Sequence, residues 1–237
     1  MAALRAALFY LGMTLSLIAV TPLFPLVLPL PFPARFRVLS TWARFNLWWL
    51  RVTCGVHWQV EGLDNLPRAG GAVVLAKHQS TWETLGLQRI LPPHTWVLKR
   101  ELLRIPLFGW GLAVLRAIAI DRKAGRRALQ QVVEQGNERL EAGIWVVVFP
   151  EGTRTAPGSR QEYNVGGAML ATKTGFPVVP IAHNAGEFWP KQGWRKRPGT
   201  ITVVIGPVIP AAGRKAGEVN AEAEAWIESK SSEISGL

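Results

Sequence analysis

The sequence predicts an α/β fold, in which a mixed and largely parallel sheet is flanked by helices and preceded by an N-terminal membrane-associated helical hairpin. From residue 56 onward, short apolar runs rich in β-branched residues alternate with stretches of helical periodicity, as in α/β proteins. Before them, residues 6–34 carry no charged side chain, a run longer than the ~20 apolar residues that a helix needs to cross a bilayer. We therefore expect two regions, a membrane-associated segment over residues 1–53 and an α/β domain over residues 54–237.

The uncharged run is interrupted in its second half, because five prolines fall between residues 22 and 33. Proline breaks a helix interior, so an uninterrupted helix is expected over residues 6–21, a length that is marginal for a membrane span. A cleaved signal peptide is the alternative interpretation, although no small-x-small cleavage site follows the apolar core and the apolar tract continues past it.

The next stretch, FRVLSTWARFNLWWLRV at residues 36–52, predicts an amphipathic helix. Arg37, Arg44 and Arg51 recur every seven residues and therefore share one face. The other side is expected to carry apolar and aromatic residues, namely Leu39, Trp42, Phe45, Trp49 and Val52. This pattern is typical of a helix that lies in the membrane interface; a helix packed on its own domain is the alternative. Together the two segments predict a helical hairpin dipped into one leaflet, with the rest of the chain on the cytoplasmic face of the inner membrane.

The α/β region is expected to contain seven strands with five helices between and after them. The apolar runs that predict strands are residues 56–60, 71–76, 95–98, 117–120, 144–149, 177–182 and 201–205. The helical stretches lie near residues 80–91, 107–115, 124–141, 164–174 and 217–233. In sheets of this kind, functional groups collect at the carboxyl edge, where each strand delivers the chain to the next loop or helix.

Composition narrows the classes of function. The formal net charge of +11 favours an anionic partner. Residues 1–60 contain no acidic residue, and their basic residues lie among Trp, Phe and Leu, which favours membrane lipid over nucleic acid. The single cysteine, Cys54, excludes an internal disulfide framework and a Cys-based zinc site. The four histidines show no metal-ligand spacing, and neither a nucleotide-binding P-loop nor a Gly-x-Ser-x-Gly nucleophile motif is present. We therefore expect no metal and no cofactor.

Ionisable residues follow nearly every expected strand. Of these, His78 with Glu83 is the best acid–base pair. The candidate anion ligands are Lys99, Arg122 and Arg154. Two interpretations of Glu83 remain open at this point. It forms either a capping box with Ser80, in which its carboxylate binds a backbone N–H at a helix start, or a pair with His78 that is poised for proton transfer.

Four segments, HQSTWE, VLKRELLRIPLFGWGLAVLRAIAIDR, FPEGTRT and VVPIAH, occur in this order over about residues 77–183. They resemble the four motif blocks of the glycerophospholipid acyltransferases. The first is similar to the His-x-x-x-x-Asp motif of that family, with glutamate in place of the usual aspartate. Within the family, the blocks look most like those of the 1-acyl-glycerol-3-phosphate acyltransferases, which make phosphatidic acid. An N-terminal helical pair that dips into the membrane also fits this resemblance.

The resemblance implies transfer of a fatty acyl group from acyl-coenzyme A or an acyl carrier protein to the sn-2 hydroxyl of 1-acyl-glycerol-3-phosphate (lysophosphatidic acid). His78 would be the general base, and Glu83 would orient the imidazole and offset its charge, without a covalent enzyme intermediate. Arg154 offers a planar fork of donors for a phosphate, and Glu151 is expected to orient Arg154 or to bind a glycerol hydroxyl. The substrate-binding residues implied are Lys99, Arg122, Glu151, Gly152, Thr153 and Arg154.

Two alternative functions remain open, and so does the role of one segment. The acceptor could be another lysolipid, such as a lyso-ornithine lipid or a lysophospholipid. The chain could also be a non-catalytic membrane-binding module, although such a module needs no histidine beside a carboxylate. The segment EFWPKQGWRKRPG at residues 187–199 interleaves aromatic and basic residues. This segment would bind acidic lipid headgroups or the phosphates of coenzyme A, or it would be a solvated loop with no ligand.

Overall fold

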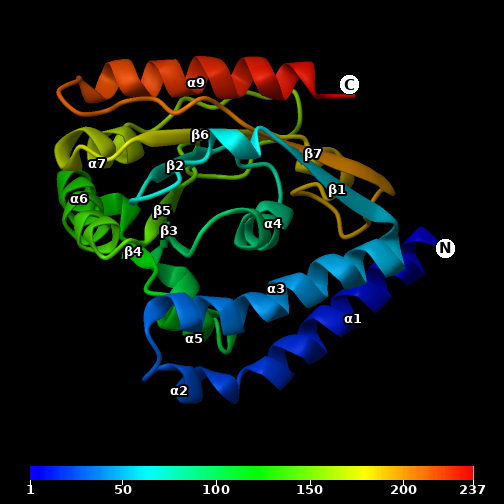
Figure 1. Ribbon diagram of the computed structural model, residues 1–237. Helices are drawn as coiled ribbons and strands as arrows, with labels where there is room; N and C mark the ends of the chain where they lie inside the picture. The colour runs from blue at the N-terminus through cyan, green and yellow to red at the C-terminus, as the bar shows by residue number, and fades with distance from the viewer. Residues whose placement is uncertain (237) are drawn as a thin grey trace.

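The protein is described by a computed structural model that covers residues 1–236, with the exception of the Arg122 side chain. In this part of the chain, a seven-stranded sheet lies between a layer of helices that includes the C-terminal helix and an N-terminal helical hairpin (Figure 1). The strands are β1 Val56–Glu61, β2 Val73–Ala76, β3 His94–Lys99, β4 Ile118–Ile120, β5 Trp145–Val148, β6 Val178–His183 and β7 Gly199–Ile205. Each expected strand is therefore confirmed, with shifts of only a few residues at the ends.

The strand order is β1-β7-β6-β2-β5-β3-β4. Every neighbouring pair is parallel except β6 and β7, which are antiparallel. The sheet is therefore mixed and largely parallel, as expected. Because β6, β2 and β5 are adjacent and parallel, the residues that follow them leave the sheet at the same edge.

Alternate residues of the central strands face different cores. In β2, Val74 and Ala76 belong to the core shared with the N-terminal helices, whereas Val73 and Leu75 belong to the core on the other face. This period of two is the geometry of any strand, and burial on both faces explains why the central strands are continuous apolar runs.

Two groups of helices cover the sheet. The second core contains residues of α6 Arg126–Glu141, α7 Gly166–Thr174 and α9 Ala216–Glu233. The first core contains residues of α4 Trp82–Ile90 and α5 Phe108–Val114. These five helices match the five expected from the sequence. The structure adds the short helix α8 Ala185–Phe188 and the 3-10 turns η1 Leu63–Asn65, η2 Arg100–Arg104 and η3 Arg122–Ala124.

The N-terminal hairpin consists of α1 Ala2–Val20, the short α2 Leu23–Val27 and α3 Phe32–Cys54. The prolines mark the reversal of the chain between the two long helices, since Pro22 directly precedes α2 and Pro31 directly precedes α3. By length and composition α1 could cross a membrane. Its outer face exposes Leu4, Leu8, Leu11, Leu15 and Ile18. A continuous exposed apolar face of this kind indicates association with a membrane.

Helix α3 packs on the sheet domain through one face and leaves the other free. Its buried side chains include Phe36, Leu39, Ala43, Leu47 and Leu50. The three arginines at seven-residue spacing are exposed, as predicted, but Phe45 and Val52 are exposed beside them rather than opposite. Each is about 100° around the helix from an arginine, and both lie on the wide part of α3 that faces away from the sheet. The hairpin and the sheet thus share one core, and the division at residue 53 stays a prediction.

Candidate active site

His78 and Glu83 lie in the connection between β2 and α4. The His78 Nδ1 atom is 2.7 Å from Glu83 Oε1. The same oxygen accepts the backbone N–H groups of Gln79 at 3.1 Å and Ser80 at 2.9 Å, while Ser80 Oγ accepts the N–H of Trp82. One carboxylate oxygen thus meets the histidine and also binds two backbone N–H groups before α4, although α4 has Thr81 rather than the expected Ser80 at its N-cap.

The environment of Glu83 favours its ionised form. Its side chain is fully buried, and burial alone raises the pKa of a carboxyl group. The neighbouring His183 and the hydrogen bonds from His78 and the Ser80 N–H outweigh burial and hold the pKa of Glu83 below its ordinary value. An ionised carboxylate can only accept a hydrogen bond. It therefore fixes the hydrogen on Nδ1 of His78 and leaves the lone pair on Nε2.

Backbone contacts and a ring contact hold His78 in place. Its imidazole stacks on Phe149, with ring centroids 4.2 Å apart and planes inclined by 15°. Its N–H donates to Glu151 Oε2 at 2.6 Å, and its carbonyl accepts from the N–H of Thr155 at 2.8 Å. All three partners come from the end of β5 and the loop after it. The adjacent loops of β2 and β5 therefore interlock around the histidine.

His183, at the end of β6, lies next to the His78–Glu83 pair. Its Nε2 is 2.8 Å from the carbonyl oxygen of Lys77 and 3.9 Å from Glu83 Oε2, and its Nδ1 accepts from the N–H of Ala185. Burial lowers the pKa of His183 against the opposing effect of Glu83, and both ring nitrogens bind backbone groups. Its contacts place it as a support for the loop rather than a group that faces a substrate.

The carboxylate of Glu151 faces protein groups. Its Oε1 is 2.6 Å from Lys77 Nζ and accepts the hydroxyl of Thr155 at 2.9 Å, while its Oε2 holds the His78 N–H. Burial raises the pKa of Glu151 against the opposing effect of Lys77. The sequence interpretation placed Glu151 beside Arg154 or a glycerol hydroxyl; in the structure its oxygens contact Lys77, Thr155 and the His78 N–H instead.

Arg154 lies at the rim of the same loop. One of its guanidinium nitrogens, Nη1, donates to Thr81 Oγ1 at 2.8 Å, which links it to the histidine loop. Gly152 adopts a φ of +69°, a left-handed conformation that suits glycine and gives the turn its shape. Thr153 is exposed. Lys191 reaches over from a later loop and donates to the carbonyl of Arg154 at 2.8 Å.

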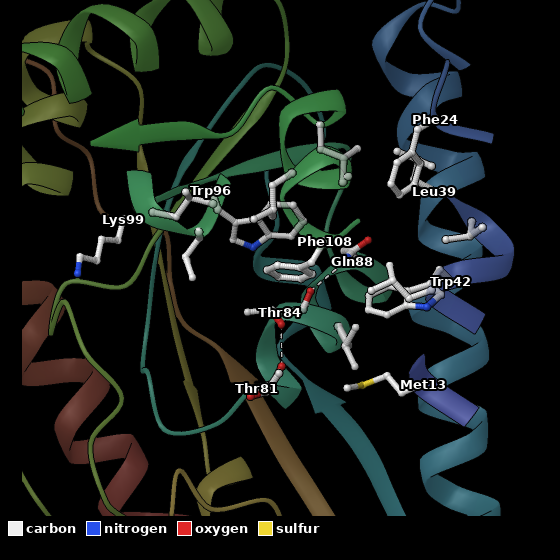
Figure 2. Close-up of a pocket in the computed structure, with 18 of the residues that line it drawn as sticks. Met13, Phe24, Leu39, Trp42, Thr81, Thr84, Gln88, Trp96, Lys99 and Phe108 are labelled. Carbon is white, nitrogen blue, oxygen red and sulfur yellow. Dashed lines mark hydrogen bonds between the residues drawn. The ribbon is translucent and has the colours of Figure 1, made fainter. Parts of the chain in front are cut away.

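Lys99 stands apart from this network. It ends β3, its side chain is 52% exposed, and its Nζ is 3.6 Å from Glu101 Oε1. It contributes to the edge of the cavity described below, but its ammonium points away from the cluster of rings at the centre (Figure 2). The side chain of Arg122, the other expected cation after β4, lies outside the described part of the chain.

An apolar cavity of about 400 Å³ lies between the hairpin, α4, α5 and β3 (Figure 2). Met13, Phe24, Trp42 and Phe108 are among the side chains of its wall, and His78 also borders it. Its few polar residues include Thr81 and Thr84 on the side of α4. A concave apolar site with few polar groups is the usual form of a binding site for a ligand with a large apolar part.

The basic loop over residues 189–198 is fastened to α1. Lys196 is buried, and its Nζ donates to Tyr10 Oη and to the carbonyl of Trp194, at 2.7 Å each. The ammonium also lies over the rings of Tyr10 and Trp189, a favourable cation–π arrangement. Burial lowers the pKa of Lys196 to about 8. Lys191, Trp194, Arg195 and Arg197 remain exposed, so the fastening carries an exposed basic segment to the side of the hairpin.

Sequence reasoning missed several residues of this site. Phe149, Thr81, Lys77 and Glu228 were not assigned a role, and Lys191 was noted only as part of the basic segment 187–199. Phe149 and Thr81 lie inside recognised motifs and Lys77 directly precedes one, so their positions were a usable signal. Glu228 is one of five glutamates in the C-terminal segment, and nothing in its spacing distinguishes it from the others.

Comparison with known proteins agrees with this geometry. The model of the acyltransferase family matches residues 57–184. The chain is 49% identical over 240 residues to the 1-acyl-sn-glycerol-3-phosphate acyltransferase of Pseudomonas aeruginosa, covering 99% of this chain and 93% of that one. The chain belongs to the family of 1-acyl-sn-glycerol-3-phosphate acyltransferases. It is therefore an acyltransferase, and the non-catalytic alternative falls away.

More distant relatives extend the comparison. The 1-acyl-sn-glycerol-3-phosphate acyltransferase alpha of Ovis aries is 32% identical over 183 residues, which cover 76% of this chain and 64% of that one. The crystal structure of the 1-acyl-sn-glycerophosphate (LPA) acyltransferase PlsC from Thermotoga maritima matches with a TM-score of 0.83, at 24% identity, over 99% of this chain and 96% of the other. This likeness shows that the two proteins share their fold, including the N-terminal helices.

Proposed function

We propose that this acyltransferase moves a fatty acyl group from an acyl thioester to the sn-2 hydroxyl of 1-acyl-glycerol-3-phosphate and so makes phosphatidic acid. The observation that carries the proposal is the contact of 2.7 Å between His78 Nδ1 and Glu83 Oε1 at the wall of an apolar cavity. The family membership of the chain supports the same substrate, because the relatives named above are acyltransferases for 1-acyl-glycerol-3-phosphate.

The chemistry needs no covalent enzyme intermediate. The acceptor hydroxyl attacks the thioester carbonyl while Nε2 of His78 takes its proton, a contribution of about 10²–10⁴-fold to the rate. The positive charge that then forms on the imidazole is offset by the ionised Glu83. The new carbon–oxygen bond forms, the carbon–sulfur bond breaks, and His78 returns the proton to the departing thiolate.

The phosphate of the acceptor is proposed to bind beside this pair. Arg154 has one hydrogen bond to Thr81 and presents the rest of its guanidinium fork at the rim of the loop. Gly152 and Thr153 can add a close backbone approach and a hydroxyl. Arg122 stays a prediction as a further phosphate contact, whereas the exposed Lys99 ammonium lies beside Glu101 and is not assigned to the phosphate. Glu151 acts, on this proposal, through Lys77 and His78 rather than on the substrate.

The apolar cavity is proposed to hold an acyl chain, and the hairpin to place its opening at the membrane. The exposed leucines of α1 and the exposed Phe45 and Trp48 of α3 suit the interface of one leaflet. The exposed cations of the 189–198 loop lie beside α1 and suit acidic headgroups. We infer a position at the cytoplasmic face of the inner membrane, where acyl-coenzyme A or an acyl carrier protein can serve as donor.

The test is mass spectrometry of the lipids formed by the detergent-purified chain from lysophosphatidic acid and a long-chain acyl-coenzyme A. We expect phosphatidic acid from the wild type, its loss in His78→Ala, and a sharp reduction in Glu83→Gln. His57→Ala is the matched control, because His57 is exposed on β1. Parallel reactions with an acyl carrier protein donor, a lyso-ornithine lipid and a lysophospholipid identify other substrates. Phosphatidic acid formed at the wild-type rate by His78→Ala would overturn the mechanism.

A further inference from the structure

A buried ionic cluster joins the catalytic loop to the C-terminal helix. The side chain of Lys77 is only 2% exposed, and its Nζ lies 2.6 Å from Glu151 Oε1 and 2.7 Å from Glu228 Oε1. Glu228 belongs to α9 and is 8% exposed. The hydroxyl of Tyr163 donates to the same Glu228 oxygen at 2.9 Å. One ammonium group is thus shared by two buried carboxylates from different parts of the chain.

Stability alone is a poor explanation for such a cluster. Taking charges out of water carries a large desolvation cost, and well-packed apolar residues often replace a buried ion pair without loss of stability. Lys77 follows an apolar strand and lies next to the fully buried Ala76, where an apolar side chain would continue the core. Burial also raises the pKa of Tyr163, so its hydroxyl keeps its proton and stays a donor to Glu228.

The other end of the cluster is the catalytic histidine. Glu151 is held by Lys77 through one oxygen and accepts the His78 N–H at 2.6 Å through the other. Thr155, which donates its hydroxyl to Glu151, also donates its N–H to the His78 carbonyl. An unbroken path of short contacts therefore runs from Glu228 through Lys77 and Glu151 to the backbone of His78.

We propose that Glu228 is a positioning residue for acyl transfer, which acts through Lys77 to hold Glu151 in the orientation that fixes His78 against Glu83. The proposal rests on the proposed role of His78 as general base. It gives α9 a part in the reaction, although α9 lies beyond residues 57–184 that match the family model. Without the Glu228 charge, Lys77 is free to turn fully toward Glu151 and to draw that carboxylate away from the His78 N–H.

The kinetic test uses the full-length chain in detergent with three variants on α9. Glu228→Gln keeps the shape and the hydrogen bonds but removes the charge, and Glu228→Leu removes both. Glu222→Gln is the matched control, since Glu222 is an exposed residue of the same helix. Among the contacts described, its only ion-pair partner is Arg214. We expect kcat to fall about tenfold in Glu228→Gln and about 100-fold in Glu228→Leu, because small displacements of a catalytic group cost rates of this order. The KM values for both substrates should stay within about twofold.

Two further readouts separate positioning from a general loss of folded protein. The melting temperature gives the folded fraction at the assay temperature. The downfield proton resonance of the His78 Nδ1–H reports its hydrogen bond to Glu83, and we expect it to shift or broaden in Glu228→Leu but not in Glu222→Gln. A kcat that merely follows the folded fraction, with this resonance unmoved, would overturn the proposal, as would full activity in folded Glu228→Leu.

A double-mutant cycle tests the route through Lys77. If Glu228 acts only through Lys77, the variant Lys77→Met and the double variant Lys77→Met/Glu228→Gln lose kcat by the same factor. A double variant that loses kcat by the product of the two single-variant factors would contradict this route. Failure of the underlying function is distinguishable, because it would appear as a wild-type chain that makes no phosphatidic acid or as an active His78→Ala. Normal Glu228 variants beside an inactive His78→Ala would overturn only the positioning role.

Discussion

The loops that follow β2 and β5 differ from those that follow β3 and β4, although all four carry ionisable residues. After β2 and β5, His78 and Glu151 join in a buried network with contacts of 2.6–2.9 Å. After β3 and β4, Arg100 pairs with Asp121 at 3.0 Å and Lys99 with Glu101 at 3.6 Å, with mostly exposed side chains. The first pair of loops forms the proposed chemical site, and the second pair forms a charged surface.

Strand order explains this difference. β2 and β5 are neighbours in the middle of the sheet, with β6 on the other side of β2, whereas β4 is an edge strand. The end of a central strand is covered by helices on both faces, so polar groups there must pair with one another. The connection from β3 to β4 contributes differently, because Phe108 and Gly111 of α5 form part of the cavity wall. One region therefore holds the proposed reacting groups, and the other lines the cavity beside them.

Among the changes that probe this contrast, the largest effect is expected from Glu83→Asp, which puts the usual aspartate of the motif in place of glutamate. A single glutamate oxygen reaches His78 Nδ1 and two backbone N–H groups. A carboxylate that is shorter by one methylene cannot keep all three contacts on this loop, and we expect kcat to fall about 10–100-fold. Steady-state kinetics at saturating substrate, with Glu101→Asp as the surface control, measures the effect. Wild-type kcat in Glu83→Asp would show that the loop adapts to either residue.

Arg154→Ala is expected to raise the KM for lysophosphatidic acid about 10–100-fold, because a charge-assisted hydrogen bond contributes about 1.5–3 kcal/mol. The KM of Arg154→Lys should lie between those of the wild type and Arg154→Ala, since lysine keeps the charge but loses the planar fork. Arg100→Ala is the matched control from the other pair of loops, and its KM should change less than about twofold. A fall in kcat at unchanged KM would assign Arg154 to the transition state instead of to substrate binding.

The sequence was sufficient for the elements of the fold and for the central pair. Continuous apolar runs identify buried strands without any knowledge of their neighbours, and all seven runs proved to be strands. His78 and Glu83 are five residues apart on one loop, so their contact is set by local geometry. The combination of contacts was harder to foresee, because binding the backbone and meeting the histidine looked like alternatives, and one oxygen does both.

Contacts between distant residues could not be predicted. Lys77 and Glu228 are separated by 151 positions, and no local pattern selects one glutamate of α9 over the others. Glu151 was assigned to the substrate because its motif was recognised, but its burial depends on β5 lying beside β2, and strand order is a tertiary property. The exposure of Phe45 and Val52 likewise depends on which face of α3 meets the sheet, and the spacing of the arginines does not determine that face.

The cavity wall on α5 offers a way to change specificity without touching the reacting groups. A side chain at Gly111 would meet the ring of Phe24, with its Cβ 3.1 Å from the nearest carbon. We therefore expect Gly111→Leu to lower kcat/KM for a long acyl donor about tenfold relative to a short one, in line with the discrimination that a few methylenes provide. Competition between donors of different length, read by mass spectrometry, checks this. Gly217→Leu on α9 is the control, since its Cβ faces open space. An equal loss for all donors would indicate damage to the fold.

The smallest effect is expected from Lys99→Ala, and it tests the contrast between the two pairs of loops most directly. Lys99 has the residue type and the motif position of a phosphate ligand, but its exposed ammonium and its contact with Glu101 describe a surface ion pair, which contributes little in water. We expect the KM for lysophosphatidic acid to change less than about twofold. A rise comparable to that of Arg154→Ala would mean that Lys99 turns toward the site when substrate binds. The loop after β3 would then be part of the phosphate site, and the separation between the two pairs of loops would hold only for the free enzyme.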